Sequence, residues 1–190
     1  MPIILLDQDG PLAWFDRAVH RVLDEHGYDS SALVRTEWET TNDVARCFGA
    51  EAAGIVDRAR HSAGFYRDLE PVEGAVQGVQ NLLDAGCELI VCTAPSLENP
   101  SCASDKIAWI AEHFPALRRH FVITKDKTLV RGHVLLDDKP EVKGTLPPTW
   151  AHVRFDTPGN AHVTHGEVML GWDHWADLLA RAREIESGGR

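Results

Sequence analysis

Short apolar runs that alternate with helical patterns constrain the fold of this chain more than any other feature of its sequence. Between the runs, helical patterns cover residues 74–83, with a stop at Gly86, and residues 105–114, before Pro115. The order of the patterns predicts a doubly wound α/β core with a parallel sheet. Five runs have the length and residue types of buried strands: residues 3–6, 89–92, 121–123, 134–136 and 153–155.

The segment of residues 14–70 departs from this alternation. It carries about three helical patterns and no convincing strand, and Gly27 marks the expected end of the first helix. We therefore predict a small helical cap over residues 14–70, inserted after the first strand. Residues 1–13 and 71–190 would form the catalytic core, and the last five residues, 186–190, would be a disordered tail.

Length and charge limit the classes of function. A chain of 190 residues with 44% hydrophobic content can bury one core and a modest insertion, but not two full-sized domains. The formal net charge of −10 argues against a broad basic surface that binds a nucleic acid polymer. A small phosphorylated substrate would need local positive charge from a metal ion, a lysine or a helix N-terminus.

The cysteines and the N-terminal sequence indicate a cytoplasmic protein. Cys47, Cys87, Cys92 and Cys102 lack the spacing of a zinc site and are too few for a disulfide framework, which fits a reducing compartment. We find no targeting pattern before the first strand, and no segment approaches the ~20 apolar residues of a membrane span. We therefore expect no membrane partner.

Chemically active side chains follow four of the predicted strands. Ligands bind at the carboxyl ends of the strands in open parallel sheets, so these positions are candidates for a site. Taken singly, each group has an ordinary explanation, such as an Asp-Gly turn or a solvated lysine. Together, acid, hydroxyl, lysine and acid in this order predict a phosphate and metal site. In chain order the groups are Asp7 and Asp9, Thr93 and Ala94, Lys127, and Asp137 and Asp138.

The four groups resemble the four motifs of the haloacid dehalogenase (HAD) superfamily. A narrower resemblance, to the 5′(3′)-deoxyribonucleotidases, spans nearly the whole chain. It is most specific over residues 122–142 and weakest over residues 28–64. The stretches that carry it are LLDQDGPLAWF, LEPVEGA, VCTAP, ITKDKTLVRGHVLLDDKPEV, PTWAHVRF and GWDHWADLL.

The resemblance implies roles for five residues, and each role makes chemical sense. Asp7 would be the nucleophile and Asp9 the general acid and base, since a carboxylate can form an aspartyl-phosphate. Asp7, Asp137 and the backbone carbonyl of Asp9 would bind Mg²⁺, which prefers oxygen ligands. Thr93 and Lys127 would bind the phosphate.

This chain departs from the family pattern at two positions. Family members commonly have Ser after the motif threonine and Arg two residues before the motif lysine, where this chain has Ala94 and Lys125. Ala94 keeps its backbone N–H, so we still expect it to bind phosphate. Lys125 replaces a planar guanidinium by an ammonium, which affects substrate preference more than the chemistry. We expect Asp138 to support the site indirectly by holding Lys127.

Three aromatic residues are candidates for the substrate pocket. Phe15 lies where the resembling family has an aromatic side chain beside the base or sugar, and Trp38 and Tyr66 would be further walls. Ordinary packing in the cap is the alternative for all three, and we expect Trp14 in the core. The resemblance implies substrates like dUMP and dTMP and a homodimer. An apolar wall against the 2′ carbon would favour deoxyribose over ribose.

Two other functions remain open from the sequence. The chain could be a HAD phosphatase for a sugar phosphate or another small phosphomonoester, because the motifs do not distinguish these substrates. It could also be a non-catalytic HAD-fold protein that binds nucleotides, since fold alone does not establish activity. Retention of a nucleophile beside a general acid argues against the second alternative.

Overall fold

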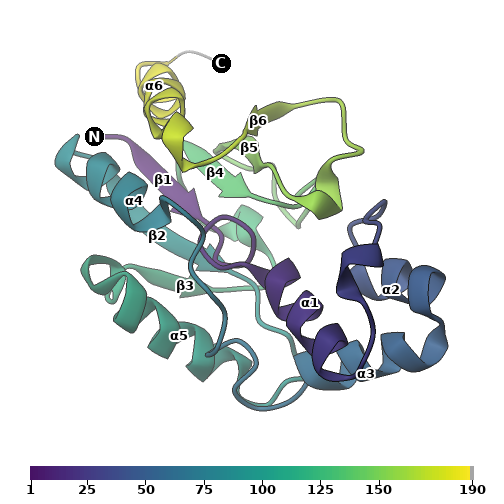
Figure 1. The fold of residues 1–190 in the computed structure, drawn as a ribbon. Coiled ribbons are helices and arrows are strands. Elements are labelled where there is room, and N and C mark those ends of the chain that lie inside the picture. Colours follow the sequence, from purple (N-terminus) through teal and green to yellow (C-terminus); the bar gives the residue numbers. More distant parts are fainter. Residues whose placement is uncertain (189–190) are drawn as a thin grey trace.

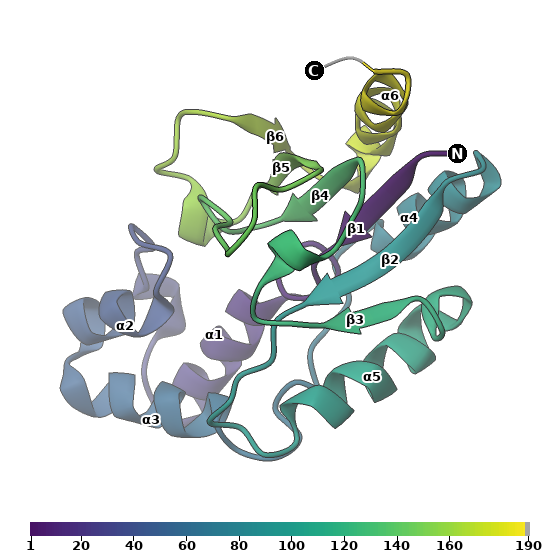
Figure 2. The same cartoon turned by 180° about the vertical axis from the view of Figure 1, so that it is seen from behind.

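The computed structural model describes residues 1–188, and within this range six parallel strands form one sheet in the order β3-β2-β1-β4-β5-β6 (Figures 1 and 2). The predicted α/β fold is therefore confirmed. Each predicted strand is present, with some ends shifted. The strands are β1 (Ile3–Leu6), β2 (Glu88–Thr93), β3 (Phe121–Ile123), β4 (Val134–Asp137), β5 (Ala151–Phe155) and β6 (Glu167–Met169).

The sixth strand corrects the prediction of five. Strand β6 pairs with β5 at one edge of the sheet, and of its three residues only Met169 is buried. An edge strand with exposed Glu167 and Val168 has no continuous apolar run. The pattern used to recognise buried strands therefore does not detect it.

Six α-helices accompany the sheet in the described part of the chain: α1 (Phe15–Glu25), α2 (Thr40–Phe48), α3 (Ala50–Arg60), α4 (Ala75–Asp84), α5 (Cys102–His113) and α6 (Trp175–Glu186). The two helices predicted in the core are confirmed as α4 and α5. Helix α4 begins one residue later than predicted because Gly74 adopts a left-handed conformation (φ 76°) at its N-cap.

The central strands are buried on both faces, which explains their apolar runs. In β1, Ile4 and Leu6 belong to the main hydrophobic core with the helices. Leu5 points to the opposite face and packs with Leu135 and Trp150 in a second, smaller cluster. Apolar packing on both faces thus fixes the central strands, and with them the positions of the residues at their carboxyl ends.

Helices α1, α2 and α3 gather beyond the carboxyl ends of the strands (Figures 1 and 2). The buried side of α1 carries Ala18, Val19, Val22 and Leu23, and the helix ends just before Gly27, as the sequence predicts. This arrangement suits the helical segment predicted over residues 14–70. The division into cap and core at those boundaries stays a prediction.

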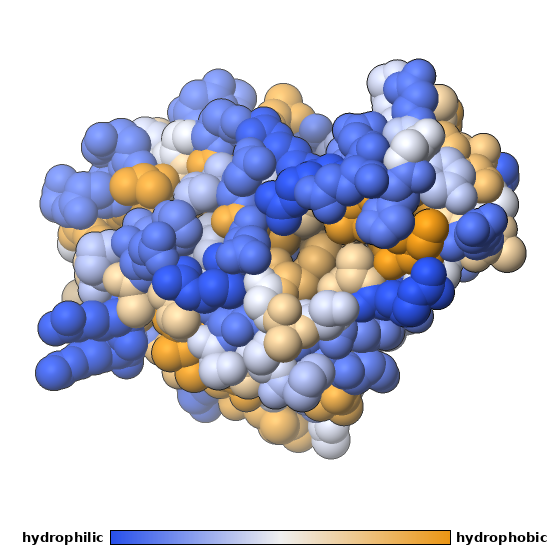
Figure 3. All heavy atoms as spheres, turned by 60° about the horizontal axis from the view of Figure 1, so that its bottom comes forward, coloured by the Kyte–Doolittle hydropathy of each residue, from blue (hydrophilic) through white to orange (hydrophobic). Residues whose placement is uncertain are grey.

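The surface, the helices and the C-terminus each add one observation. Hydrophilic residues cover much of the face in Figure 3, with smaller groups of apolar residues between them. Among the helices of residues 1–188, none combines the length and apolar character needed to cross a membrane. The predicted tail overlaps the last residue of α6, Glu186, and residues 189–190 lie outside the described residues.

Candidate active site

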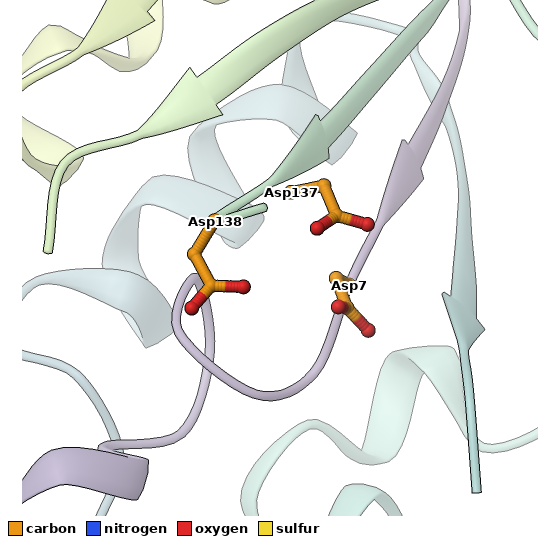
Figure 4. A group of neighbouring side chains, drawn as sticks. All are labelled: Asp7, Asp137 and Asp138. Atoms are coloured by element: carbon orange, nitrogen blue, oxygen red, sulfur yellow. The ribbon is translucent and has the colours of Figure 1, made fainter. Parts of the chain in front are cut away.

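Three carboxyl groups gather at the ends of two neighbouring strands. Asp7 follows β1, Asp137 ends β4, and Asp138 is the next residue (Figure 4). One oxygen of each group lies within 4.8 Å of the others. Because β1 and β4 are adjacent and parallel, their carboxyl ends meet at the same edge of the sheet. Clustered carboxylate oxygens suit a hard divalent cation, so this acidic group could hold a metal ion.

Lys127 sits beside the acidic group. Its Nζ lies 2.7 Å from Asp7 Oδ2 and 2.5 Å from Asp137 Oδ2, and only 3% of its side chain is exposed. A short 3₁₀ helix (Lys127–Leu129) carries it, and the Asp126 side chain caps this helix by accepting from the Thr128 N–H. Burial alone would lower the pKa of Lys127, but Asp7 and Asp137 outweigh burial and raise it. The lysine therefore stays cationic.

The expected contact between Asp138 and Lys127 is absent. Lys127 pairs with Asp7 and Asp137, whereas Asp138 packs over Gly10, where any Cβ atom would overlap its carboxyl group. Neighbouring residues at a strand end point in different directions, so Asp137 turns toward the lysine and Asp138 does not. Burial and the charge of Asp137 raise the pKa of Asp138 well above its usual value.

Asp9 has a partner that the sequence analysis missed. Lys106, from α5, donates to Asp9 Oδ2 over 2.7 Å and to Thr93 Oγ1 over 3.1 Å. Its side chain is fully buried. The sequence does carry a signal, since Lys106 shares the buried face of α5 with Cys102, Trp109 and Ile110. A lysine on such an apolar helix face needs a buried partner.

Asp7 and Asp9 have pKa values shifted in opposite directions. For Asp7, burial favours the neutral acid, but the charges of Lys127 and Lys106 outweigh burial and lower its pKa. For Asp9, burial raises the pKa, Lys106 opposes the rise, and the charge of Asp7 adds to it. The first carboxyl group is thus favoured as an anion and the second as an acid.

A cavity of about 510 Å³ opens above these groups, between the strand ends and the helical segment. Asp7 and Asp9 line it, whereas Thr93, Lys127 and Asp137 are buried behind that lining. The other residues predicted for the pocket all line the cavity: Phe15, Trp38, Tyr66, Ala94 and Lys125. Trp14, which we had expected in the core, lines the cavity as well.

The aromatic side chains in the wall of the cavity pack against one another. The ring of Phe15 lies 6.4 Å from that of Tyr66, and both rings contact Phe65 at centroid distances of 5.6 and 5.2 Å. Lys125 donates to the carbonyl of Pro95 over 3.2 Å and reaches the same cavity. Core packing and pocket lining are thus combined in the same aromatic residues.

Arg35 anchors the wall that bears Trp38, and the sequence analysis missed it as well. Its buried guanidinium pairs with Asp16 and Asp43, and its Nη2 donates to the carbonyls of Glu37 and Trp38, each over 3.2 Å. An isolated arginine in a polar stretch gives no periodic signal, and only the folded chain brings its two acidic partners together.

The family model described as 5′ nucleotidase, deoxy (pyrimidine), cytosolic type C protein matches residues 1–185. The chain belongs to this nucleotidase family. Membership places it among the phosphoric monoester hydrolases of the HAD superfamily, and the family expected from the motifs is confirmed.

Two relatives of this nucleotidase are similar over nearly their whole length. A Bordetella pertussis protein, provisionally named a 5′(3′)-deoxyribonucleotidase, is 32% identical over 179 residues, which cover 94% of this chain and 95% of that protein. The human 5′(3′)-deoxyribonucleotidase of cytosolic type is 30% identical over 191 residues, with coverage of 95% and 94%.

A solved structure supports the fold. The crystal structure of a HAD family hydrolase from Deinococcus radiodurans, with bound phosphate and sodium, matches the nucleotidase described here with a TM-score of 0.58. The match covers 96% of both chains at 15% identity. At this identity the likeness establishes the HAD fold and nothing further.

Proposed function

We propose that this protein is a Mg²⁺-dependent 5′(3′)-deoxyribonucleotidase, which hydrolyses deoxyribonucleoside monophosphates such as dUMP and dTMP to nucleoside and phosphate. One observation carries the proposal: Asp7, Lys127 and the acidic group meet below an aromatic-walled cavity of about 510 Å³. Cavities of this size suit small organic ligands. Family membership supports a nucleotide as the substrate.

The reaction would proceed in two displacements. An Asp7 oxygen attacks phosphorus, the bond from phosphorus to the 5′ or 3′ oxygen breaks, and Asp9 donates its proton to that oxygen. Water then attacks the phosphorus of the aspartyl-phosphate and gives a proton to Asp9, which releases phosphate and restores Asp7. Thr93 and the Ala94 N–H would donate to the phosphate, and Lys127 would offset its charge.

The acidic group fits a divalent cation. Asp7 and Asp137, with the backbone carbonyl of Asp9, would hold Mg²⁺, and Asp138 is close enough to support it. A bound Mg²⁺ would reduce the repulsion between these carboxylates and the substrate phosphate.

The preference for deoxyribose would come from the cavity wall. Phe15 and Tyr66 present aromatic surface to the site, and a ribose 2′ hydroxyl against such a surface is buried without a partner. Pockets that must reject one added hydroxyl usually discriminate by about 10². We therefore expect a bias toward deoxyribonucleotides, with ribonucleotides as slower substrates.

A panel of phosphate esters tests the proposal. We would measure phosphate release from dUMP, dTMP, dCMP, dGMP, UMP and glucose 6-phosphate in Mg²⁺ and in EDTA. Mg²⁺-dependent release that is fastest from the deoxynucleotides supports the proposal. Faster release from glucose 6-phosphate would make the protein a sugar phosphatase, and binding of dUMP without any release would favour the non-catalytic alternative.

We further propose a cytoplasmic location and a homodimer. All four cysteines are free, which suits a reducing compartment. Named relatives include a cytosolic type and a mitochondrial type, so the cysteines carry this proposal rather than the relatives. Size-exclusion chromatography with light scattering measures the oligomeric state directly.

A further inference from the structure

The fully buried Lys106 has no part in the reaction outlined above. It reaches from α5 to the strand ends, and its ammonium contacts Asp9 Oδ2 at 2.7 Å and Thr93 Oγ1 at 3.1 Å. The ring centroid of Tyr66 lies 5.1 Å from the same nitrogen. Burial of an ammonium costs several kcal/mol unless the charge is paired. Two hydrogen bonds and the contact with the Tyr66 ring make the buried position of the ammonium tolerable.

The contacts also determine which atoms donate and which accept. An ammonium group has three donors and no acceptor, so Asp9 Oδ2 and the Thr93 hydroxyl oxygen must both accept from Lys106. The hydroxyl proton of Thr93 then goes to another acceptor, and a hydrogen bond from Thr93 contributes to the lowered pKa of Asp7. The second oxygen of Asp9, Oδ1, is buried and has no hydrogen-bond partner among residues 1–188, although Asp9 lines the cavity.

We propose that Lys106 is a positioning residue for proton transfer: its contacts with Asp9 Oδ2 and the Thr93 hydroxyl hold the Asp9 carboxyl group in the orientation from which it protonates the leaving oxygen. This inference rests on the proposed phosphatase function. Lys127 pairs with Asp7 and Asp137, so the two buried lysines have separate tasks. Lys127 serves the nucleophile and the metal ligands, and Lys106 serves the acid.

The role of Lys106 predicts that the cost of losing it depends on the leaving group. A nucleoside oxygen must be protonated as it departs, whereas p-nitrophenolate leaves without a proton. The value of kcat/KM reports the first displacement, in which this difference appears. In Lys106→Met, kcat/KM should fall about 10²-fold or more for dUMP and less than about 10-fold for p-nitrophenyl phosphate.

A second readout separates the two displacements. Asp9 must still take a proton from water in the second one, whichever ester was used. The Met variant should therefore release a rapid burst of p-nitrophenolate, close to one per enzyme, before a slower steady state. Loss of packing alone would not produce a burst.

Two further variants separate the proposed role of Lys106 from a general loss of packing or folding. Lys106→Gln keeps N–H donors without the charge, so its loss with dUMP should be smaller than that of the Met variant, and it tests the proposal if the Met variant does not fold. Trp109→Phe is the matched control, because it removes a hydrogen bond from the same helix to the Leu69 carbonyl. It should leave the ratio of the two kcat/KM values unchanged.

The outcomes distinguish this inference from the proposed function. If the wild type hydrolyses both esters and the Lys106 variants lose the same factor on each, the positioning role is wrong. If the wild type hydrolyses a different alkyl phosphate better than dUMP, that ester replaces dUMP in the comparison. A wild type that hydrolyses no phosphate ester would overturn the proposed function, and this inference with it.

Discussion

Two aspartates only two residues apart are prepared for opposite tasks by their neighbours. Asp7 is surrounded by Lys127 and Lys106, which overcome burial and lower its pKa, while burial and the charge of Asp7 raise the pKa of Asp9. Carboxyl pairs whose environments push their pKa values apart are the usual basis for dividing nucleophile from acid. The pair therefore has the properties that the proposed mechanism needs.

Replacement of the proposed nucleophile, Asp7, should abolish turnover. In Asp7→Asn the amide cannot attack phosphorus, and a metal ligand is weakened, but the side-chain volume hardly changes. We expect no steady-state phosphate release from dUMP and an unchanged circular dichroism spectrum. The control is Asp68→Asn, the same chemical change at an exposed position. Turnover by purified Asp7→Asn above the background of a mock preparation would remove Asp7 from the mechanism.

Replacement of the proposed general acid, Asp9, should reduce turnover severely without abolishing it. Asp9→Asn loses proton transfer, which contributes typically about 10²–10⁴-fold to rate. Its kcat/KM for dUMP should fall within that range, as measured in steady-state assays with Mg²⁺. A loss below about 10-fold would mean that another group protonates the leaving oxygen.

At the scale of single residues, the sequence predicts those that follow strands and misses those that depend on packing. Asp7, Asp137 and Lys127 are recognisable because each follows an apolar run. Lys106 belongs to the middle of a helix, and its partners come from elsewhere in the chain. The direction of the Asp138 side chain also depends on the backbone after β4, which no spacing rule supplies.

At the scale of elements, the loop that bears Trp38 depends on Asp43 in α2. Asp43 is fully buried and accepts from Arg35 and from the backbone N–H groups of Thr36 and Glu37. Burial would raise its pKa, but hydrogen bonds from Thr36, Glu37 and Arg46 outweigh burial and lower the pKa to about 2. The ionised carboxylate is thus the form that holds the loop and the adjacent cavity wall.

The lowered pKa of Asp43 gives a pH dependence with a definite sign. A depressed pKa in the folded state contributes stability above the ordinary value of 3.8, and that contribution disappears as the pH falls toward about 2. At pH 7, Asp43→Asn should lower the free energy of unfolding by about 2–4 kcal/mol. In urea titrations at pH 7, 4 and 3, the difference from wild type should shrink only at the lowest pH.

Two outcomes would contradict this account of Asp43. A difference in unfolding free energy that is the same at pH 7 and pH 3 would mean that ionisation of Asp43 is not what stabilises the loop. An Asp43→Asn protein as stable as wild type at pH 7 would mean that the contacts of Arg35 are dispensable.

As with the residues, some elements can be predicted from local sequence and others cannot. Strands β1, β2, β4 and β5 lie inside the sheet and carry the apolar runs of buried strands, and the edge strand β3 keeps an apolar run as well. The edge strand β6 has exposed Glu167 and Val168 and lacks such a run. Helix α5 begins three residues before its predicted start. Pairing and capping decide these details, and both depend on contacts that are distant in sequence.

At the scale of the whole molecule, an acidic protein has to attract an anionic substrate. The net charge is −10, and a substrate phosphate would bring further negative charge to the carboxyl groups at the strand ends. A divalent cation bound there would offset that added charge. Metal binding should therefore stabilise the fold as well as support the reaction.

Thermal unfolding tests metal binding without measuring activity. At about 100 times its Kd, Mg²⁺ should raise Tm by roughly 5–10 °C relative to EDTA. Asp137→Asn should lose most of this shift, and Asp68→Asn should keep it. A shift that is equal in wild type and Asp137→Asn would mean that Mg²⁺ binds away from the acidic group.

The most direct test of the central claim is to look for the phosphoryl group on Asp7. We would mix the protein with dUMP and Mg²⁺, quench with acid within milliseconds, and identify the modified peptide by mass spectrometry, with Asp7→Asn treated in parallel. The account predicts one phosphoryl group on the N-terminal peptide at Asp7, and none in Asp7→Asn. Rapid hydrolysis of dUMP by the wild type, with no phosphorylated peptide at any quench time, would contradict it.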